Sequence, residues 1–169
     1  GDDAVLVYRH DRAEQRVRAG KLMVAVGRAP GYAGLHPERA GVKVNAKGII
    51  TDAYLRTSAK HIYAAGDIAG PYQLSHMAGH QGMTATLNAF LPLRRRAERE
   101  RVPWCVFTDP ELARSGLTEE EARARGAVKV FRYNAADIDR YRAERETDGF
   151  IKYITDRKYR ILGVHIVAS

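Results

Sequence analysis

The stretch HIYAAGDIAGPYQLSHMAGHQG, residues 61–82, constrains the fold more than any other part of the sequence. It opens on a short apolar segment, residues 61–65, which we interpret as a buried strand. A Gly-Asp pair follows directly, at Gly66 and Asp67, and a helix is expected to begin a few residues later, near Ser75. The order of strand, polar turn and helix is typical of an α/β layer.

Small side chains are predicted to line one face of that helix. Ala78, Gly82, Ala85 and Ala89 recur at spacings of four, three and four residues, which places them on the same side of an α-helix. Such a face lets the helix backbone approach a neighbouring element closely. Tight packing of the helix on a sheet explains this spacing as well as a ligand-binding role does.

The Gly66-Asp67 pair admits two interpretations. A carboxylate beside a residue without a side chain can accept hydrogen bonds from a ligand's hydroxyl groups, while the ligand lies against bare backbone. The unpaired N–H groups at the start of the following helix would favour an electron-rich ligand atom. Gly-Asp is also common in ordinary turns, so the spacing by itself favours a turn aspartate over a ligand aspartate.

Two segments before this stretch have strand patterns. Residues 4–8 and 21–26 read as strands around a polar connector, and the second strand ends in GRAPG at 27–31. Glycines that flank a proline mark a sharp exit into a loop, which is a usual place for a ligand to meet a sheet. Residues 41–50 read as two short strands joined at residues 45–48.

The pattern changes in the last third of the chain. Thr118 and Glu121 have the spacing of a capping box, and Gly126 is placed to end the short helix expected over about 119–125. Residues 149–154 and 160–167 read as the two strands of a hairpin with a polar turn. This region is therefore predicted to be an α+β unit with an antiparallel sheet.

Length and composition favour a globular protein of one domain or two small ones. The 169 residues are 45% hydrophobic and 28% charged. No apolar run approaches the roughly 20 residues that span a bilayer, and no segment has the order of a signal peptide. The one cysteine, Cys105, has no partner for an internal disulfide. We expect a soluble chain in a reducing, cytoplasmic compartment.

A net charge of +8 and a pI near 9.8 raise the question of nucleic-acid binding, for which LRRRAERER at 93–101 is the obvious place. That run includes Glu98 and Glu100, and no aromatic residues between the arginines offer a surface for stacking bases. A solvated connector is the favoured interpretation, with phosphate binding as the minor alternative.

Both ends of the sequence are unusual for a whole protein. It opens on GDDAVLVYRH without an initiator Met and closes on ILGVHIVAS, which has a strand pattern but no following turn. An unpaired terminal strand would present an exposed edge. The sequence is therefore expected to be a segment of a longer protein.

Four stretches are spaced over most of the chain, and they are KLMVAVGRAP, HIYAAGDIAGPYQLSHMAGHQG, VPWCVFTDPELARSGLTEEEA and GFIKYITDRKYRILGVHIVA. In this order they resemble the pyridine nucleotide-disulfide oxidoreductases, the FAD enzymes that include dihydrolipoamide dehydrogenase, glutathione reductase and mercuric reductase. The sequences VPWCVFTDPE and YQLSHMAGHQG are most similar to the mercuric-reductase-like branch of the family.

The resemblance implies a fold and a division of the chain. The fold is an α/β FAD/NAD(P)-binding portion followed by an α+β dimerisation domain with an antiparallel sheet. Residues 1–35 would be the end of the NAD(P)-binding domain, 36–100 the C-terminal part of the FAD-binding domain with a connector, and 101–169 a truncated dimerisation domain.

The resemblance also implies roles for particular residues. Asp67, after Gly66, would bind the ribityl hydroxyl groups of FAD, and Gly27 would lie against the nicotinamide cofactor, NAD(P)H. Four residues at the helix start would line the isoalloxazine ring with their main-chain N–H groups near its pyrimidine edge; they are Gln73, Leu74, Ser75 and His76. No catalytic residue and no metal ligand is predicted in this chain.

The sequence departs from the family pattern in three ways. It has neither of the G-x-G-x-x-G loops that seat the two pyrophosphates. It lacks the redox-active cysteine pair, which Cys105 cannot replace because a dithiol cycle needs two thiols. It also lacks the His-x-x-x-x-Glu acid-base pair, and we interpret His165, within the apolar hairpin, as structural.

Three functional hypotheses result. In the first, the longer protein passes electrons from NAD(P)H through FAD to a disulfide or related acceptor, and this segment alone is inactive. In the second, the chain is a dimerisation or interaction module that forms a homodimer without activity of its own. In the third and weaker one, the arginine cluster binds nucleic acid, in a manner that salt would weaken steeply. Disulfide, dihydrolipoyl and mercuric-ion acceptors stay open, as does the choice of NADH or NADPH; no membrane partner is expected.

Overall fold

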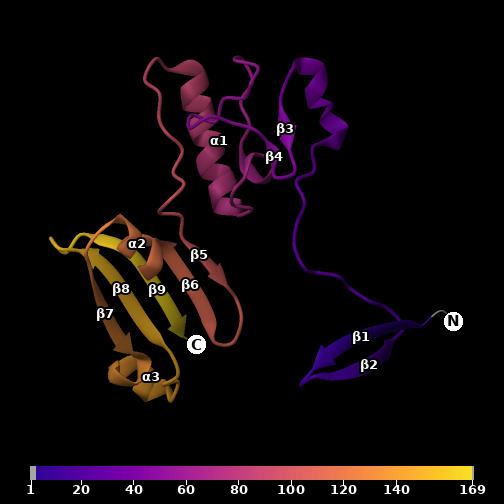
Figure 1. Cartoon of the computed structure of the whole chain (residues 1–169). Helices are drawn as coiled ribbons and strands as arrows, with labels where there is room; N and C mark the ends of the chain where they lie inside the picture. The colour runs from indigo at the N-terminus through magenta and orange to yellow at the C-terminus, as the bar shows by residue number, and fades with distance from the viewer. Residues whose placement is uncertain (1–2, 169) are drawn as a thin grey trace.

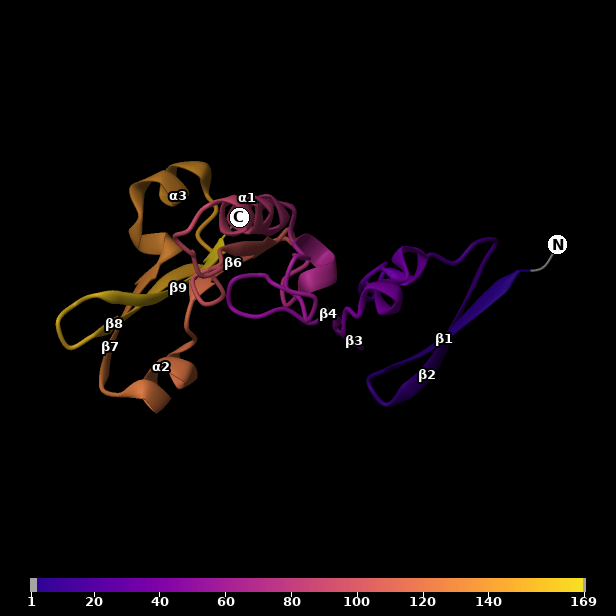
Figure 2. The same ribbon diagram turned by 90° about the horizontal axis from the view of Figure 1, so that it is seen from above.

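The computed structural model describes residues 3–168, in which three parts follow one another along the chain (Figure 1). The first is an antiparallel hairpin of β1 (Ala4–His10) and β2 (Ala13–Ala19). An extended segment connects it to the second part, which contains the long helix α1, and a connector leads on to a five-stranded sheet. The hairpin stands apart from the rest of the chain in both views (Figures 1 and 2).

The prediction of a strand over residues 21–26 is wrong, because the structure has no strand there. The second strand of the hairpin is instead β2, which covers the polar segment that was interpreted as a connector. Asp11 and Arg12 both have positive φ, the geometry that tight hairpin turns require, so β2 pairs directly with β1. The apolar segment 21–26 has no described strand to bond with, and Val26 is 93% exposed.

The second part is built around a small apolar core. Its elements are the short helices η1 (Ala33–Leu35), η2 (Pro37–Ala40) and η3 (Gly66–Ala69), the strands β3 (Val44–Asn45) and β4 (Gly48–Ile49), and helix α1 (Ser75–Phe90). The predicted pair of short strands is confirmed as β3 and β4. Val42, Ile49 and Ala64 form the core.

The predicted strand over residues 61–65 is wrong as a regular element. Tyr63 makes only an isolated bridge with Arg56. Ala64 is nevertheless buried, as the apolar pattern indicated. A single bridge leaves the backbone on either side free to bend, and the chain turns into η3 within three residues.

Helix α1 begins at Ser75 as predicted, but its buried face differs from the predicted stripe of small residues. The buried residues are Met77, Gln81, Thr84, Ala85 and Asn88, whereas Ala89 is exposed. The two amides can be buried because each finds hydrogen-bond partners inside. Close approach is confirmed at one point, since a Cβ atom at Gly66 would lie 3.2 Å from the Cβ of Ala78.

The third part is an antiparallel sheet in the order β5-β6-β9-β8-β7. Its elements are the strands β5 (Trp104–Val106), β6 (Glu111–Gly116), β7 (Val128–Asn134), β8 (Phe150–Asp156) and β9 (Ile161–Ala168) and the helices α2 (Glu119–Arg125), η4 (Ala135–Asp137) and α3 (Asp139–Glu144). The predicted hairpin, α+β class and capping box of Thr118 and Glu121 are confirmed. Beyond the predicted hairpin, β9 also pairs with β6, so the last described strand lies at the centre of the sheet.

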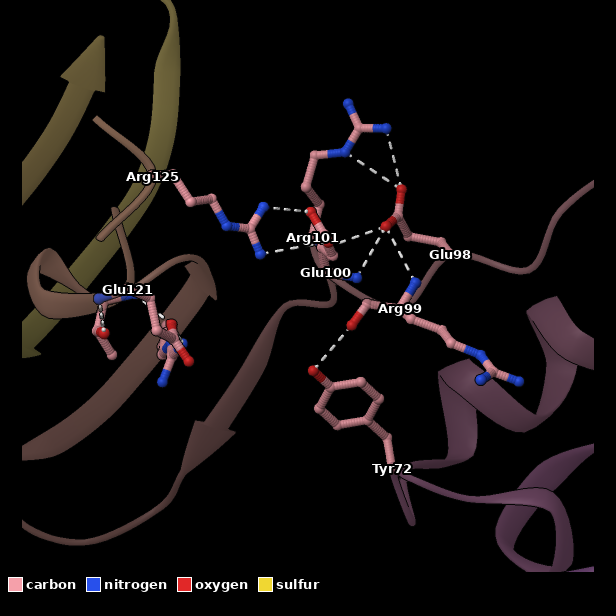
Figure 3. Close-up of polar contacts among 9 residues, drawn as sticks. Tyr72, Glu98, Arg99, Glu100, Arg101, Glu121 and Arg125 are labelled. Carbon is pink, nitrogen blue, oxygen red and sulfur yellow. Dashed lines mark hydrogen bonds and ion pairs between the residues drawn. The ribbon is translucent and has the colours of Figure 1, made fainter. Parts of the chain in front are cut away.

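The charged connector is largely exposed to solvent, as predicted, and it is organised around Glu98. Its carboxylate accepts hydrogen bonds from the backbone N–H groups of Arg99, Glu100 and Arg101, at 3.0, 3.0 and 3.2 Å (Figure 3). The Arg101 guanidinium completes the cluster with an ion pair to Glu98. These contacts, with the N–H groups of Glu100 and Arg101 foremost, lower the pKa of Glu98 to about 2.

The connector also bonds to the parts on either side of it (Figure 3). The Tyr72 hydroxyl donates to the Arg99 carbonyl at 3.1 Å, on the side of α1. Arg125, the last residue of α2, pairs with Glu100 at 3.1 Å. Among residues 3–168, no helix is long and apolar enough to span a membrane.

Candidate functional site

A cavity of about 880 Å³ lies between the N-terminal end of α1 and the sheet. Residues 73–76 form one wall, so the structure brings together the four predicted ring-binding residues Gln73, Leu74, Ser75 and His76. Strands β5, β6 and β9 form the opposite wall, with Cys105, Ala113, Val164 and Ile166 among the lining side chains. The wall from the sheet is therefore largely apolar, and the wall from α1 is polar.

The N-terminal end of α1 has no side-chain cap. Its N-cap residue is Leu74, which cannot accept a hydrogen bond through its side chain, and the first intrahelical bond is donated by the Ala78 N–H. The N–H groups before Ala78 are therefore unpaired within the helix, and they begin at residues that line the cavity. A helix end of this kind favours an electron-rich or anionic ligand atom.

Gly66 and Asp67 open the turn η3 and are not among the residues that line the cavity. Gly66 is buried with φ of +79°, a conformation that favours glycine, and it lies against Ala78 of α1. The Asp67 carboxylate is half-buried and makes no hydrogen bond to another residue of the described chain. Its oxygens are thus free to accept hydrogen bonds from a ligand.

A residue that sequence reasoning missed, Gln81, holds this turn in place. Its Oε1 accepts a hydrogen bond from the Gly66 N–H at 2.7 Å, and its Nε2 donates to the Gly70 carbonyl at 3.4 Å. Gln81 is only 1% exposed. The available signal was a pair of amides, Gln81 and Asn88, seven residues apart and therefore on one face of the helix.

The structure does not place Gly27 in the cavity lining, and a Cβ atom there would meet open space. The next residue, Arg28, does line the cavity, and its guanidinium donates a long hydrogen bond of 3.5 Å to the Gln73 carbonyl. Arg28 was also missed. It stood inside the predicted loop, but nothing in the local pattern separated it from its neighbours.

Two side chains of the cavity have restricted chemistry. The His76 ring, through Nε2, donates to the Pro103 carbonyl at 2.9 Å, so the ring ties α1 to the segment before β5. Desolvation first, and then the Glu111 carboxylate 3.9 Å away, raise the pKa of the Cys105 thiol. A raised pKa disfavours the thiolate, which is the nucleophilic form of a cysteine. No group of three or more metal-ligating side chains occurs within residues 3–168.

His165 lies in the third part, away from the cavity lining. Cross-strand pairing places it between Arg114 and Lys152, and neither ring nitrogen has a hydrogen-bond partner in the part of the chain that is described. Burial first, followed by these two cations, lowers the pKa of His165. The lowered pKa favours the neutral ring, and its place on a central strand is consistent with the predicted structural role.

The donor set fits the FAD that the sequence resemblance implies. The uncapped helix end offers N–H groups to an acceptor edge, and the opposing apolar wall suits a flat aromatic ring. Asp67 offers a carboxylate without a partner to hydroxyl groups nearby. The helix end and the apolar wall are complementary to the ring of a flavin, and the Asp67 carboxylate is complementary to its polyol.

Comparison with known proteins gives matches along most of the chain. The family model described as pyridine nucleotide-disulphide oxidoreductase matches residues 1–82, and the model for the dimerisation domain of the same family matches residues 102–169. The predicted fold class, an α/β FAD/NAD(P)-binding portion followed by an α+β dimerisation domain, is thereby confirmed. The gap between the two matches, residues 83–101, contains the charged connector.

Curated relatives agree with these matches. The chain is 37% identical to a mercuric reductase from Bacillus cereus over 90% of this chain and 25% of the relative. It is 38% identical to a mycothione reductase from Mycobacterium tuberculosis over 89% and 34%, and 32% identical to a dihydrolipoyl dehydrogenase from Bacillus subtilis over 95% and 35%. The chain thus spans between a quarter and about a third of the length of these relatives.

Solved structures resemble the chain as a whole. The HOCl-induced flavoprotein disulfide reductase RclA from Escherichia coli superimposes with a TM-score of 0.78 at 34% identity, over 96% of this chain and 38% of RclA. LpdA from Mycobacterium tuberculosis superimposes with a TM-score of 0.82 at 26% identity, again over 96% of this chain and 38% of that protein.

Proposed function

The chain belongs to the pyridine nucleotide-disulphide oxidoreductase family, and on this premise we propose that it is the flavin-edge and dimerisation part of a longer FAD-dependent enzyme. That enzyme passes electrons from NAD(P)H through FAD to a disulfide or related acceptor. The bound flavin would supply the chemistry, as a carrier that accepts a hydride and passes electrons on. This chain supplies binding and orientation.

The observation that carries the proposal is the uncapped N-terminus of α1, which opens on the cavity of about 880 Å³. Residues 73–76 offer N–H groups to the pyrimidine edge of the ring, and the dipole of a 16-residue helix stabilises electron density there. Asp67 orients the ribityl chain by accepting hydrogen bonds from its hydroxyl groups. The apolar wall from β5, β6 and β9 excludes water from the ring.

For the nicotinamide cofactor we propose contacts near Gly27, as the resemblance implies. The glycine has no side chain, so a ligand can reach its backbone, and a Cβ there would meet nothing within 4 Å. Arg28, the next residue of the same loop, reaches the start of α1, because its guanidinium donates a hydrogen bond to the Gln73 carbonyl. The two cofactor sites would therefore be linked through adjacent residues.

We further divide the chain into the end of an NAD(P)-binding domain at 1–35, a part of an FAD-binding domain with its connector at 36–100, and a dimerisation domain from 101 to 169. The start of the second family match at residue 102 supports the last boundary. A homodimer is proposed through the third part. Phe131 and Tyr133 are 37% and 57% exposed on the sheet face opposite to the one on which Lys152 contacts α2.

The decisive experiment uses the full-length protein that contains this chain. It should be purified, its visible spectrum recorded, and the protein then titrated anaerobically with NADH or NADPH. A flavin spectrum that bleaches on titration is expected, and a long-wavelength thiolate-to-flavin band would identify a redox-active disulfide. A purified protein without flavin contradicts the proposal and leaves the interaction module as the better reading.

A further inference from the structure

The turn that carries Asp67 is held at both ends by one side chain. Gln81 accepts from the N–H of Gly66, the first residue of η3, and donates to the carbonyl of Gly70, the residue after its end. Asp67 lies between these two anchor points. A single buried amide on α1 therefore fixes the turn relative to the same helix whose N-terminus opens on the cavity.

Packing holds the second half of the turn, because Ile68 and Ala69 lie against the apolar core. The first residue, Gly66, depends on Gln81 instead. The residue before it, Ala65, provides no side-chain cap, and the Gly66 N–H has Gln81 as its partner within the described chain. Without that partner, a buried N–H group would be left unsatisfied, which is costly. Gly66 is also in a left-handed conformation, and a Cβ atom there would lie 3.2 Å from the Cβ of Ala78, so the turn passes close to the helix at this point.

We propose that Gln81 is a positioning residue, which sets where Asp67 presents its carboxylate to the ribityl hydroxyl groups of FAD. This inference rests on the proposed function. The shorter of its two hydrogen bonds, at 2.7 Å, is the one it accepts from Gly66, next to Asp67. The acceptor oxygen therefore carries most of the effect, and the donor bond to Gly70, at 3.4 Å, carries less.

The test is a double-mutant cycle on flavin affinity in the full-length protein. FAD is titrated into the apoprotein, and its dissociation constant is measured by fluorescence for the wild type, Gln81→Met, Asp67→Asn and the double variant. Each single substitution is expected to weaken FAD binding about tenfold, which corresponds to about 1.4 kcal/mol. The double variant should bind no more than about threefold more weakly than either single variant, since Gln81 acts through Asp67.

Two further variants separate positioning from general stability. Gln81→Glu keeps the acceptor oxygen, and burial favours its protonated carboxyl, which can still donate to Gly70. It should therefore bind FAD within about threefold of the wild type. Asn88→Leu removes a second buried amide from the same helix face, whose partners are Tyr54 and Arg95 rather than the Asp67 turn. It is expected to lower the melting temperature and to leave the FAD dissociation constant unchanged.

Several results would overturn the inference. One is an FAD affinity about a hundredfold weaker in the double variant than in the wild type, because the two residues would then act independently. A second is an unchanged FAD affinity in Gln81→Met. A third is a loss of FAD affinity in Asn88→Leu as large as the loss in Gln81→Met. If Gln81→Met does not fold, the cycle is run with Gln81→Asn, whose shorter side chain keeps an amide but no longer reaches the Gly66 N–H. A weakening of FAD binding that persists undiminished in the Asp67→Asn background contradicts the proposal. A wild-type protein without affinity for FAD is a different outcome, because it removes the proposed function itself.

Discussion

Asn88 and Arg95 exchange two hydrogen bonds, in which the Asn88 amide donates to the Arg95 carbonyl at 2.8 Å and accepts from the Arg95 N–H at 2.7 Å. The same amide also donates to the Tyr54 carbonyl at 2.9 Å. One buried side chain near the end of α1 thus ties the arginine-rich connector to the second part of the fold. The connector is anchored through its backbone, and the arginine side chains play no part in this contact.

Asn88→Leu is expected to reduce the free energy of unfolding by about 1 to 3 kcal/mol, because it leaves buried backbone groups of Tyr54 and Arg95 without partners. Urea unfolding followed by circular dichroism measures the change. Thr86→Ala on the exposed face of α1 is the matched control, and it should change stability by less than about 0.5 kcal/mol. Equal effects from the two substitutions would contradict the anchoring role.

The Glu98 carboxylate predicts a particular pattern of acid unfolding. Because its folded pKa is lowered from 4.5 to about 2, its contribution to stability is fully present above pH 4.5 and is lost as the pH falls toward 2. Glu98→Gln should therefore unfold with a weaker pH dependence between pH 4.5 and 2 than the wild type. Thermal unfolding at a series of pH values provides the measurement, and parallel curves for the two proteins would count against it.

His165 predicts a pH dependence in a different range. Its folded pKa lies below the ordinary value of 6.5, so the unfolded chain binds a proton more readily and stability falls as the pH drops below 6.5. The groups facing the ring are Arg114 and Lys152 on the neighbouring strands, with Glu121 contributing from α2. His165→Phe should lose part of the stability difference between pH 8 and pH 5. If the difference is unchanged in denaturant titrations, another group is responsible.

Two glycines are expected to respond in opposite directions to substitution by alanine. A Cβ at Gly163 would overlap the Leu117 carbonyl oxygen, so Gly163→Ala should destabilise the fold by about 1 to 3 kcal/mol or more. A Cβ at Gly79, on the exposed side of α1, would meet nothing within 4 Å. Gly79→Ala should therefore stabilise by about 0.5 to 1 kcal/mol through its helix propensity. Calorimetric melting temperatures test both, and a stable Gly163→Ala would refute the close contact.

Elements with local signals were predictable from the sequence. Thr118, Glu121 and Gly126 define α2 within a few residues, because caps depend on neighbours along the chain. The start of α1 at Ser75 and the hairpin of β8 and β9 follow from similar short-range patterns. The four residues around the start of α1 that line the cavity were predicted from the family resemblance instead.

Features that depend on distant partners were not predictable. Residues 21–26 look like a strand, but strand formation needs a second strand to bond with, and the described chain offers none there. The role of Gln81 depends on a contact with Gly66, 15 residues earlier, which no local pattern announces. Whether the small residues or the amides of α1 are buried depends likewise on what the rest of the fold places against the helix.

The central position of β9 has a consequence for synthesis of the protein. Strands β5 and β6 pair with each other, as do β7 and β8, but the two pairs join only through β9. On the ribosome they therefore emerge as separate hairpin-like units, and their common sheet cannot form until Ile161–Ala168 has left the exit tunnel. Until that moment, the edges of β6 and β8 are open to other nascent chains.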